Sequence, residues 1–349
     1  MSHLEPNISL YNLPAKFSDF HGMPYRFLGK SGLRVSNVGL GTWNFGYPET
    51  GDKSRVDLDN GLAMLDRAWE LGVTFWDTAN RYNIGSGNSE RIIGKWIAAN
   101  PDKRRDVVIA SKMWGGMDGL TPNHWGLSRA NIIDSVHASL ERLQTDHMDV
   151  LYFHHPDPLV PLEESLLAVE DLIREDVIRY FAVSNADMAT LQSYDAFLTE
   201  NAPMRTRVCA VQNRFDILRG ENQAEAGVLD YCAEKGISFV AYSPLAQGLL
   251  TGRYNDLSKV GAGDRLFDEK NMGDLQNADL LKKLCALTEY AKSMDVALAT
   301  LVLAYMLKLP GMGPVIPSAS SIAQLEANAA AGTLQLTEKQ LTEIAEILK

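Results

Sequence analysis

Short apolar runs alternate with longer segments of helical periodicity along most of this chain. The apolar runs are typical of strands buried on both faces, and they cover residues 38–40, 73–76, 107–111, 148–153, 178–183, 208–211, 237–241 and 313–316. Apolar positions at helical spacing occupy residues 58–71, 89–99, 129–143, 162–175, 188–197, 224–235, 276–309, 322–331 and 338–348. This α/β alternation predicts a single parallel (β/α)8 TIM barrel, with the last two helices as additions at its C-terminal side.

The segment ahead of the first repeat predicts a β-hairpin. Two strand-like pieces within residues 25–35 flank a turn of Gly and Ser, and such a hairpin could plug the bottom of the barrel. No break in composition interrupts residues 23–349, so we expect one domain there and an N-terminal extension over residues 1–22. The Pro and Asn residues of the extension indicate an extended arm, compatible with a subunit contact in a homo-oligomer. An open doubly wound sheet is the alternative architecture.

The charge balance limits the partners of this chain. Its 349 residues carry 33 Lys and Arg against 44 Asp and Glu, a net charge of −11, whereas nucleic-acid binding needs a basic face. No apolar run reaches the length of a membrane span, and the N-terminus lacks the regions of a signal peptide. We therefore expect a cytoplasmic protein with a small-molecule substrate and with neither nucleic acid nor membrane as a partner.

Polar side chains stand where the predicted strands end. Asp77 ends the second apolar run, Lys112 the third and His154 the fourth, and Tyr82 follows shortly after the second. Barrel enzymes carry their sites at this rim, and a lysine that closes a buried strand needs a partner such as Asp77. The ammonium should lower the pKa of the Tyr82 phenol and ease proton donation. His154 would orient the reacting oxygen.

This constellation excludes several other chemistries. It contains no nucleophile–base pair, and the cysteines at 209, 232 and 285 fit no metal-binding spacing. His154 and His155 are neighbours whose side chains would leave a strand on opposite faces, so we expect no metal. Proton delivery to a developing alkoxide fits carbonyl reduction or alcohol oxidation, which needs a hydride carrier.

Several sequence blocks resemble those of the aldo-keto reductase family. DTANRY at 77–82 with SE at 89–90 is similar to the DTAxxYG…SE signature, and further matches are SK at 111–112, DVLYFHHPD at 149–157, VSN at 183–185, VQN at 211–213 and YSPL at 242–245. The resemblance covers about residues 24–349. It implies a (β/α)8 barrel that holds NAD(P)H without a Rossmann domain. It also implies reduction of an aldehyde, ketone or sugar carbonyl to an alcohol, or the reverse, by the tetrad Asp77, Tyr82, Lys112 and His154.

The resemblance also implies where the cofactor and the substrate would bind. Ser184, Asn185 and Gln212 would hold the nicotinamide carboxamide, and Tyr242 would stack on its ring. The other implied cofactor residues are Gly41, Thr42, Trp43, Asp77, Ser243, Pro244, Leu245, Gln247, Gly248, Leu250, Arg253, Ile316, Ser318, Ser320, Gln324 and Asn328. The expected substrate contacts are Trp43, Tyr82, Trp114, His154 and His155.

Two positions depart from the family pattern. Asn83 stands where Gly usually follows the tyrosine, and Asn tolerates a left-handed backbone. The block 318–324 contains no Lys or Arg to pair with the 2′-phosphate of NADP, although Arg253 could supply that charge. We favour NADPH as the cofactor, with NADH as the alternative.

Two other functions are compatible with the same residues. One is a cofactor-binding regulatory subunit with little turnover, because the resembling family includes channel-associated members. The other is a metal-dependent barrel hydrolase. Within the reductase hypothesis, the loops set the substrate, and their polar residues favour a hydroxylated substrate such as a sugar. These residues are Asn44, Asn80, Arg81, Asn123, His124 and Arg214.

Overall fold

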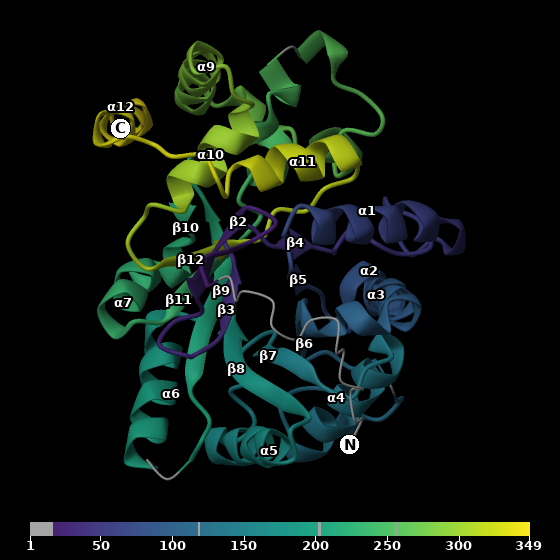
Figure 1. The fold of residues 1–349 in the computed structure, drawn as a ribbon. Coiled ribbons are helices and arrows are strands. Elements are labelled where there is room, and N and C mark those ends of the chain that lie inside the picture. The colour runs from purple at the N-terminus through teal and green to yellow at the C-terminus, as the bar shows by residue number, and fades with distance from the viewer. Residues whose placement is uncertain (1–16, 118, 202–203, 256) are drawn as a thin grey trace.

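Parallel strands form the wall of a barrel in this computed structural model (Figure 1). The structure describes residues 17–117, 119–201, 204–255 and 257–349. Within them the wall consists of β4 (Leu40–Gly41), β5 (Phe75–Asp77), β6 (Val108–Met113), β7 (Met148–Phe153), β8 (Ile178–Ser184), β9 (Val208–Asp216), β11 (Ser238–Tyr242) and β12 (Met312–Val315). A short strand, β10 (Gly220–Glu221), pairs with the end of β9.

The first and last wall strands meet, which closes the sheet on itself. The Gly39 amide donates to the Val315 carbonyl at 2.8 Å, and the Gly41 amide donates to the Pro317 carbonyl at 3.1 Å. The (β/α)8 prediction is therefore confirmed, and the open doubly wound sheet is excluded.

Helices surround the wall in the predicted order. They are α1 (Leu58–Glu70), α3 (Asn88–Ala99), α4 (Arg129–Leu143), α5 (Leu162–Arg174), α6 (Met188–Glu200), α7 (Val228–Lys235), α9 (Ala278–Ser293), α10 (Leu298–Met306), α11 (Ile322–Ala330) and α12 (Glu338–Leu348). The segment 276–309 is two helices rather than one, because the chain turns at Asp295, whose φ is +54°. None of the helices in the described residues is both long and apolar enough to cross a membrane.

A small antiparallel sheet closes the N-terminal end of the barrel, as the hairpin prediction proposed. It consists of β1 (Asp19–Phe20), β2 (Met23–Phe27) and β3 (Arg34–Ser36). Leu28 and Val35 are fully buried against the barrel interior, and the Arg26 guanidinium donates to the carbonyls of Met312 and Gly313. Of the predicted N-terminal extension, residues 1–16 lie outside the described residues.

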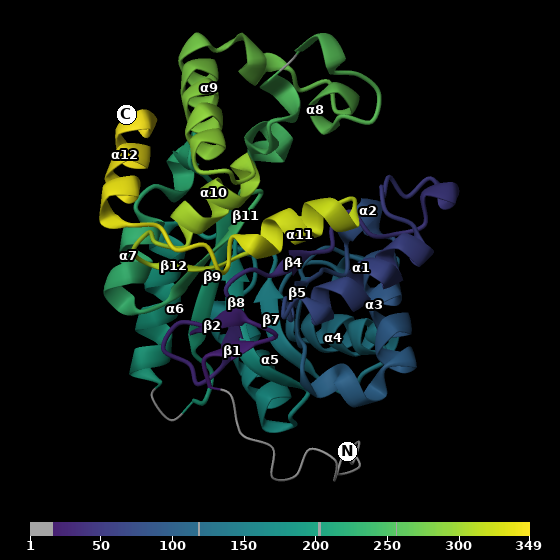
Figure 2. The same cartoon turned by 45° about the horizontal axis from the view of Figure 1, so that its top comes forward.

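The segment 244–276, between β11 and α9, rises above the C-terminal end of the barrel (Figure 2). It contains short helices, among them α8 (Arg265–Asp268). Part of it is buried, because Leu249, Leu250 and Leu266 are fully enclosed. The sequence pattern predicted a loop here, and the structure shows a succession of short helices that forms one side of the cavity described below.

Candidate active site

Lys112 lies at the C-terminal end of β6 with its side chain fully enclosed. Its Nζ donates to Asp77 Oδ1 at 2.5 Å, to the Thr78 carbonyl at 2.9 Å and to Tyr82 Oη at 2.6 Å. An ammonium has three protons, so each of them meets an acceptor. The parallel pairing of β5 with β6 brings the lysine and the aspartate together, which is the ion pair expected from the sequence.

Asp77 connects the neighbouring groups. Its Oδ1 also accepts from Tyr82 Oη at 3.1 Å, and its Oδ2 accepts from Gln212 Nε2 at 2.7 Å. Gln212 lies on β9, across the barrel. The carboxylate thus holds the lysine, the phenol and a residue expected to bind the cofactor in one hydrogen-bonded group.

The local environment keeps Tyr82 protonated. Burial, followed by the negative charge of Asp77, raises the pKa of the phenol well above its ordinary value. The expected net lowering of this pKa is therefore wrong, because desolvation of the phenol and the charge of Asp77 outweigh the effect of the Lys112 ammonium. Burial also lowers the pKa of Lys112, and Asp77 opposes that effect. The Tyr82 phenol therefore stays protonated next to the Lys112 ammonium.

The backbone around Tyr82 is unusual. Asn83 and Ile84 have φ values of +55° and +58°, and the Asn83 side-chain amide donates to the Phe45 carbonyl at 2.6 Å. Asparagine tolerates this region better than most residues, so the left-handed backbone predicted at Asn83 is confirmed. The turn directs the Tyr82 ring back toward the barrel end.

His154 packs against the Tyr82 ring, and His155 stacks on His154. The expectation that the two histidines point to opposite faces of a strand is wrong, because β7 ends at Phe153, before both of them. His154 lies edge-on to Tyr82 with ring centroids 6.0 Å apart, and the two imidazoles stack at 5.3 Å. Burial, and then the charge of Lys112, hold the pKa of His154 well below its usual value. A neutral imidazole here can donate a hydrogen bond to an oxygen without adding a positive charge to the site.

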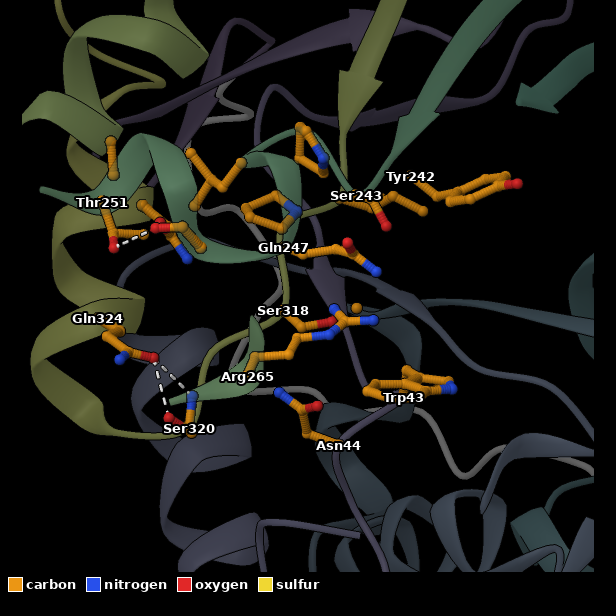
Figure 3. Close-up of a pocket in the computed structure, with 18 of the residues that line it drawn as sticks. Trp43, Asn44, Tyr242, Ser243, Gln247, Thr251, Arg265, Ser318, Ser320 and Gln324 are labelled. Carbon is orange, nitrogen blue, oxygen red and sulfur yellow. Dashed lines mark hydrogen bonds between the residues drawn. The ribbon is translucent and has the colours of Figure 1, made fainter. Parts of the chain in front are cut away.

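A cavity of about 1060 Å³ extends from this group to the N-terminus of α11. Most residues expected to bind cofactor line it: Gly41, Trp43, Asp77, Ser184, Asn185, Gln212, Tyr242, Ser243, Pro244, Leu245, Gln247, Gly248, Arg253, Ile316, Ser318, Ser320, Gln324 and Asn328. Tyr82, His154 and His155 line it as well. Figure 3 shows Tyr242, Ser243 and Gln247 facing Trp43 and Asn44 across it.

Some expected residues stand outside this lining. Thr42 is fully buried, and its hydroxyl donates to the Asp77 carbonyl, whereas Leu250 is packed in the core. Trp114 packs edge-on against His155 and Trp125, with centroids 5.2 Å and 4.9 Å away. Trp114 therefore supports the histidine side of the site rather than opening into the cavity.

The side chains expected to hold a carboxamide are already hydrogen-bonded to one another. Tyr242 Oη donates to Asn185 Oδ1 at 2.9 Å, and Asn185 Nδ2 donates to the His154 carbonyl at 2.8 Å. Ser184 Oγ donates to the Gln212 carbonyl at 2.7 Å. These bonds fix the Tyr242 ring as a flat wall beside the tetrad.

Cationic residues in the cavity wall were missed from the sequence. The Arg265 guanidinium lies 4.6 Å from the centre of the Trp43 ring, over its face (Figure 3), and Arg55 pairs with Asp268 at 3.2 Å. Both residues come from segments predicted as loops, where spacing carries no signal. Arg253, proposed to supply charge, forms an ion pair with Asp264.

Within the part of the chain that the structure describes, no three His, Cys, Asp or Glu side chains converge closely enough to hold an ion.

Comparison with known proteins shows which family this chain belongs to. A model of the aldo/keto reductase family matches residues 37–349. A probable voltage-gated potassium channel subunit beta from Arabidopsis thaliana is 32% identical over 88% of this chain and 90% of its own. An L-glyceraldehyde 3-phosphate reductase from Escherichia coli is 30% identical over 92% of this chain and 91% of its own. An uncharacterized oxidoreductase from Bacillus subtilis is 36% identical over 84% and 87%. The chain belongs to the aldo/keto reductase family.

Proposed function

We propose that this protein reduces a carbonyl to an alcohol, or catalyses the reverse, using NAD(P)H, with Tyr82 as the proton donor. The observation that carries this proposal is the position of the Tyr82 phenol. It is held by Lys112 at 2.6 Å and by Asp77 at 3.1 Å, and it lines the cavity beside His154. A weak acid kept protonated next to a fixed cation is suited to deliver a proton to an oxygen that is gaining negative charge.

Each residue has a distinct part in this proposal. The bound cofactor would supply the hydride. Tyr82 Oη gives its proton to the carbonyl oxygen as charge develops there, and the Lys112 ammonium stabilises the phenolate that remains. Asp77 keeps the ammonium in place. His154, neutral because of its lowered pKa, orients the carbonyl oxygen by a hydrogen bond.

The cavity fits an elongated dinucleotide. It begins at the tetrad and ends at α11, where Ser320 donates to Gln324 Oε1 through both its amide and its hydroxyl, at 2.8 Å and 3.1 Å. Tyr242 would stack on the nicotinamide, and Arg265 and Arg55 would face the phosphates. We favour NADPH over NADH, and the positive charge that the block 318–324 lacks would come from Arg265 and Arg55. In this structure Arg265 pairs with Glu269 at 2.8 Å and Arg55 pairs with Asp268 at 3.2 Å. Titration with each cofactor, followed by tryptophan fluorescence, tests the preference; tighter binding of NADH would reverse it.

A small hydroxylated aldehyde is the proposed substrate class. The Escherichia coli relative is named as a reductase of L-glyceraldehyde 3-phosphate, and polar Asn44 borders the cavity near Trp43. The other polar loop residues expected to favour such a substrate do not line this cavity: Asn80, Arg81, Asn123, His124 and Arg214. A panel of sugar aldehydes against aliphatic and aromatic ketones tests this choice. Preference for the ketones, as judged by kcat/KM, would contradict it.

A second candidate is a cofactor-binding regulatory subunit with little turnover. Similarity to proteins named as potassium channel beta subunits favours it. The two candidates differ in one measurement, because a regulatory subunit would bind cofactor tightly and oxidise it slowly with every carbonyl of the panel.

Replacing Tyr82 by Phe tests the proton donor directly. We expect kcat to fall by about 10²- to 10⁴-fold, while the Kd for the cofactor changes little because the ring and its packing remain. Tyr194→Phe, the same change at a buried tyrosine of α6 that does not line the cavity, serves as the control. Unchanged kcat in Tyr82→Phe would remove Tyr82 from the mechanism.

A further inference from the structure

Two buried polar residues lie behind the tetrad without touching the cavity. Ser89 and Glu90 form the first turn of α3 and match the SE of the family signature. Both are 0% exposed. Neither lines the cavity, so neither residue has a role in the proton transfer proposed above.

Ser89 ties the ends of β4 and β5 to α3. Thr78 Oγ1 lies 2.9 Å from Ser89 Oγ, which donates to the Thr42 carbonyl at 2.9 Å. Thr42 Oγ1 in turn donates to the backbone carbonyl of Asp77 at 2.9 Å. The hydroxyls therefore link the helix to the backbone that carries the tetrad's carboxylate.

Glu90 binds the next strand from the same side. Its Oε1 accepts from Ser111 Oγ at 2.5 Å, and its Oε2 accepts from Arg142 Nε at 2.6 Å. Ser111 immediately precedes Lys112 on β6, and successive side chains of a strand point to opposite faces. Glu90 thus holds the strand from the helix side at the point where the lysine enters the barrel.

The close approach of α3 to α4 makes this contact possible. A Cβ added to Gly94 would lie 2.1 Å from the Arg142 carbonyl oxygen. Gly94 is one helical turn beyond Glu90, on the same face, so the absence of a side chain there lets the carboxylate reach the arginine.

Stability alone is a weak reason for such a pair. Apolar replacements of buried ion pairs are often neutral or stabilising. Burial raises the pKa of Glu90, and the charge of Arg142 opposes that effect. The negative charge of Glu90 acts on the tetrad as well, because it raises the pKa of Lys112, as Asp77 does, against the effect of burial.

We propose that Glu90 is a positioning residue for the Tyr82–Lys112 pair, an inference that rests on the proposed carbonyl reduction. Glu90 fixes Ser111, and with it the end of β6, and it places a second buried negative charge behind the Lys112 ammonium. It touches neither the substrate nor the cofactor.

Matched variants separate this role from simple stability. Ser111→Ala removes the link to β6 and keeps the Glu90–Arg142 pair, and Glu90→Gln removes the charge. The control is Glu170→Gln, because Glu170 is another buried helix carboxylate, 2% exposed, which accepts from the Thr206 hydroxyl at 2.7 Å far from the tetrad. We measure kcat against pH, cofactor Kd, and hydrogen exchange of residues 108–113 by mass spectrometry.

We expect Ser111→Ala and Glu90→Gln to lower kcat about 10- to 100-fold through misplacement of the lysine, with the cofactor Kd retained. Exchange of residues 108–113 should be about tenfold faster, as for a lost charged hydrogen bond. In Glu90→Gln the fall of kcat at alkaline pH should begin at a lower pH than in the wild type, because the pKa of Lys112 is no longer raised by the Glu90 charge. Glu170→Gln should change none of these.

Wild-type kcat, pH profile and exchange in both variants would overturn the inference, and so would equal losses in Glu170→Gln. If Glu90→Gln does not fold, Ser111→Ala decides alone. If the wild-type protein reduces no carbonyl, the proposed function fails instead, and the exchange of residues 108–113 still shows whether Glu90 fixes the strand.

Discussion

At the scale of single residues, the site depends on a charge that is enclosed and fully partnered. Lys112 has acceptors for all of its protons, and the carboxylate that holds it also holds Tyr82 and Gln212. Removing one member of such a group leaves another charge without compensation. We therefore expect the tetrad to contribute to stability as well as to the proposed catalysis.

Lys112→Met should lower the free energy of unfolding by about 3–5 kcal/mol, because Asp77 would become an unpaired buried charge. Urea denaturation measures this. Lys339→Met, at a site whose side chain is 84% exposed, should change it by less than about 0.5 kcal/mol. Equal stability of the two variants would mean that Asp77 finds another partner.

His154 should make stability depend on pH. Its pKa is lowered in the folded protein, whereas the unfolded chain takes up a proton near pH 6.5. Unfolding is therefore favoured as the pH falls below about 6.5, with a slope of up to about 1.4 kcal/mol per pH unit for this group. His154→Gln should flatten the slope between pH 6.5 and 5, and the exposed His137→Gln should not. The same slope in all three proteins would contradict this.

At the scale of elements, the helix-to-helix spacing on one side of the barrel depends on a glycine. Gly94 faces the Arg142 carbonyl so closely that a methyl group there must displace α3 or α4. Alanine would otherwise favour a helix by about 1 kcal/mol.

Gly94→Ala should therefore destabilise the protein, by about 1–3 kcal/mol, despite its higher helix propensity. Gly61→Ala on α1 is the matched control, because its added methyl meets side-chain atoms rather than backbone: Ile92 Cγ2 at 3.0 Å and Phe45 Cδ2 at 3.4 Å. Thermal unfolding compares the two. A Gly94→Ala variant more stable than Gly61→Ala would show that the helices separate at no cost.

Element order was largely predictable because burial on both faces gives strands a continuous apolar pattern. β7 and α4 match their predicted bounds. What could not be predicted depends on single turns. The break at Asp295 within 276–309 requires one residue in the left-handed region, and periodicity continues on both sides of it. Arg265 was missed because its place over Trp43 follows from how the segment 244–276 folds.

At the scale of the whole molecule, one side of the cavity belongs to a segment that bridges distant parts of the chain. Arg265 packs on Trp43 from the β4–α1 connection, and Asp268 pairs with Arg55. The segment 244–276 thus spans the cavity between the β11 side and the β4 side of the barrel.

Arg265→Met should raise the Kd for the proposed cofactor about tenfold, the equivalent of about 1.4 kcal/mol, and should make binding less sensitive to salt. At saturating cofactor kcat should be retained. Lys270→Met, an exposed change in the same segment, is the control. Equal Kd and equal salt dependence for both variants would place Arg265 outside the phosphate contacts.

The closure of the barrel has a consequence for how the chain is made. Arg26 binds the carbonyls of residues 312 and 313, and the Gly39 amide binds the Val315 carbonyl. During synthesis from the N-terminus, the hairpin and β4 emerge first and have no partners at β12 until nearly the whole chain has left the ribosome. Contacts so distant in sequence form slowly, and unpaired strand edges are prone to aggregate. A nascent chain of this protein is therefore exposed to aggregation through an open sheet edge until β12 has been synthesised.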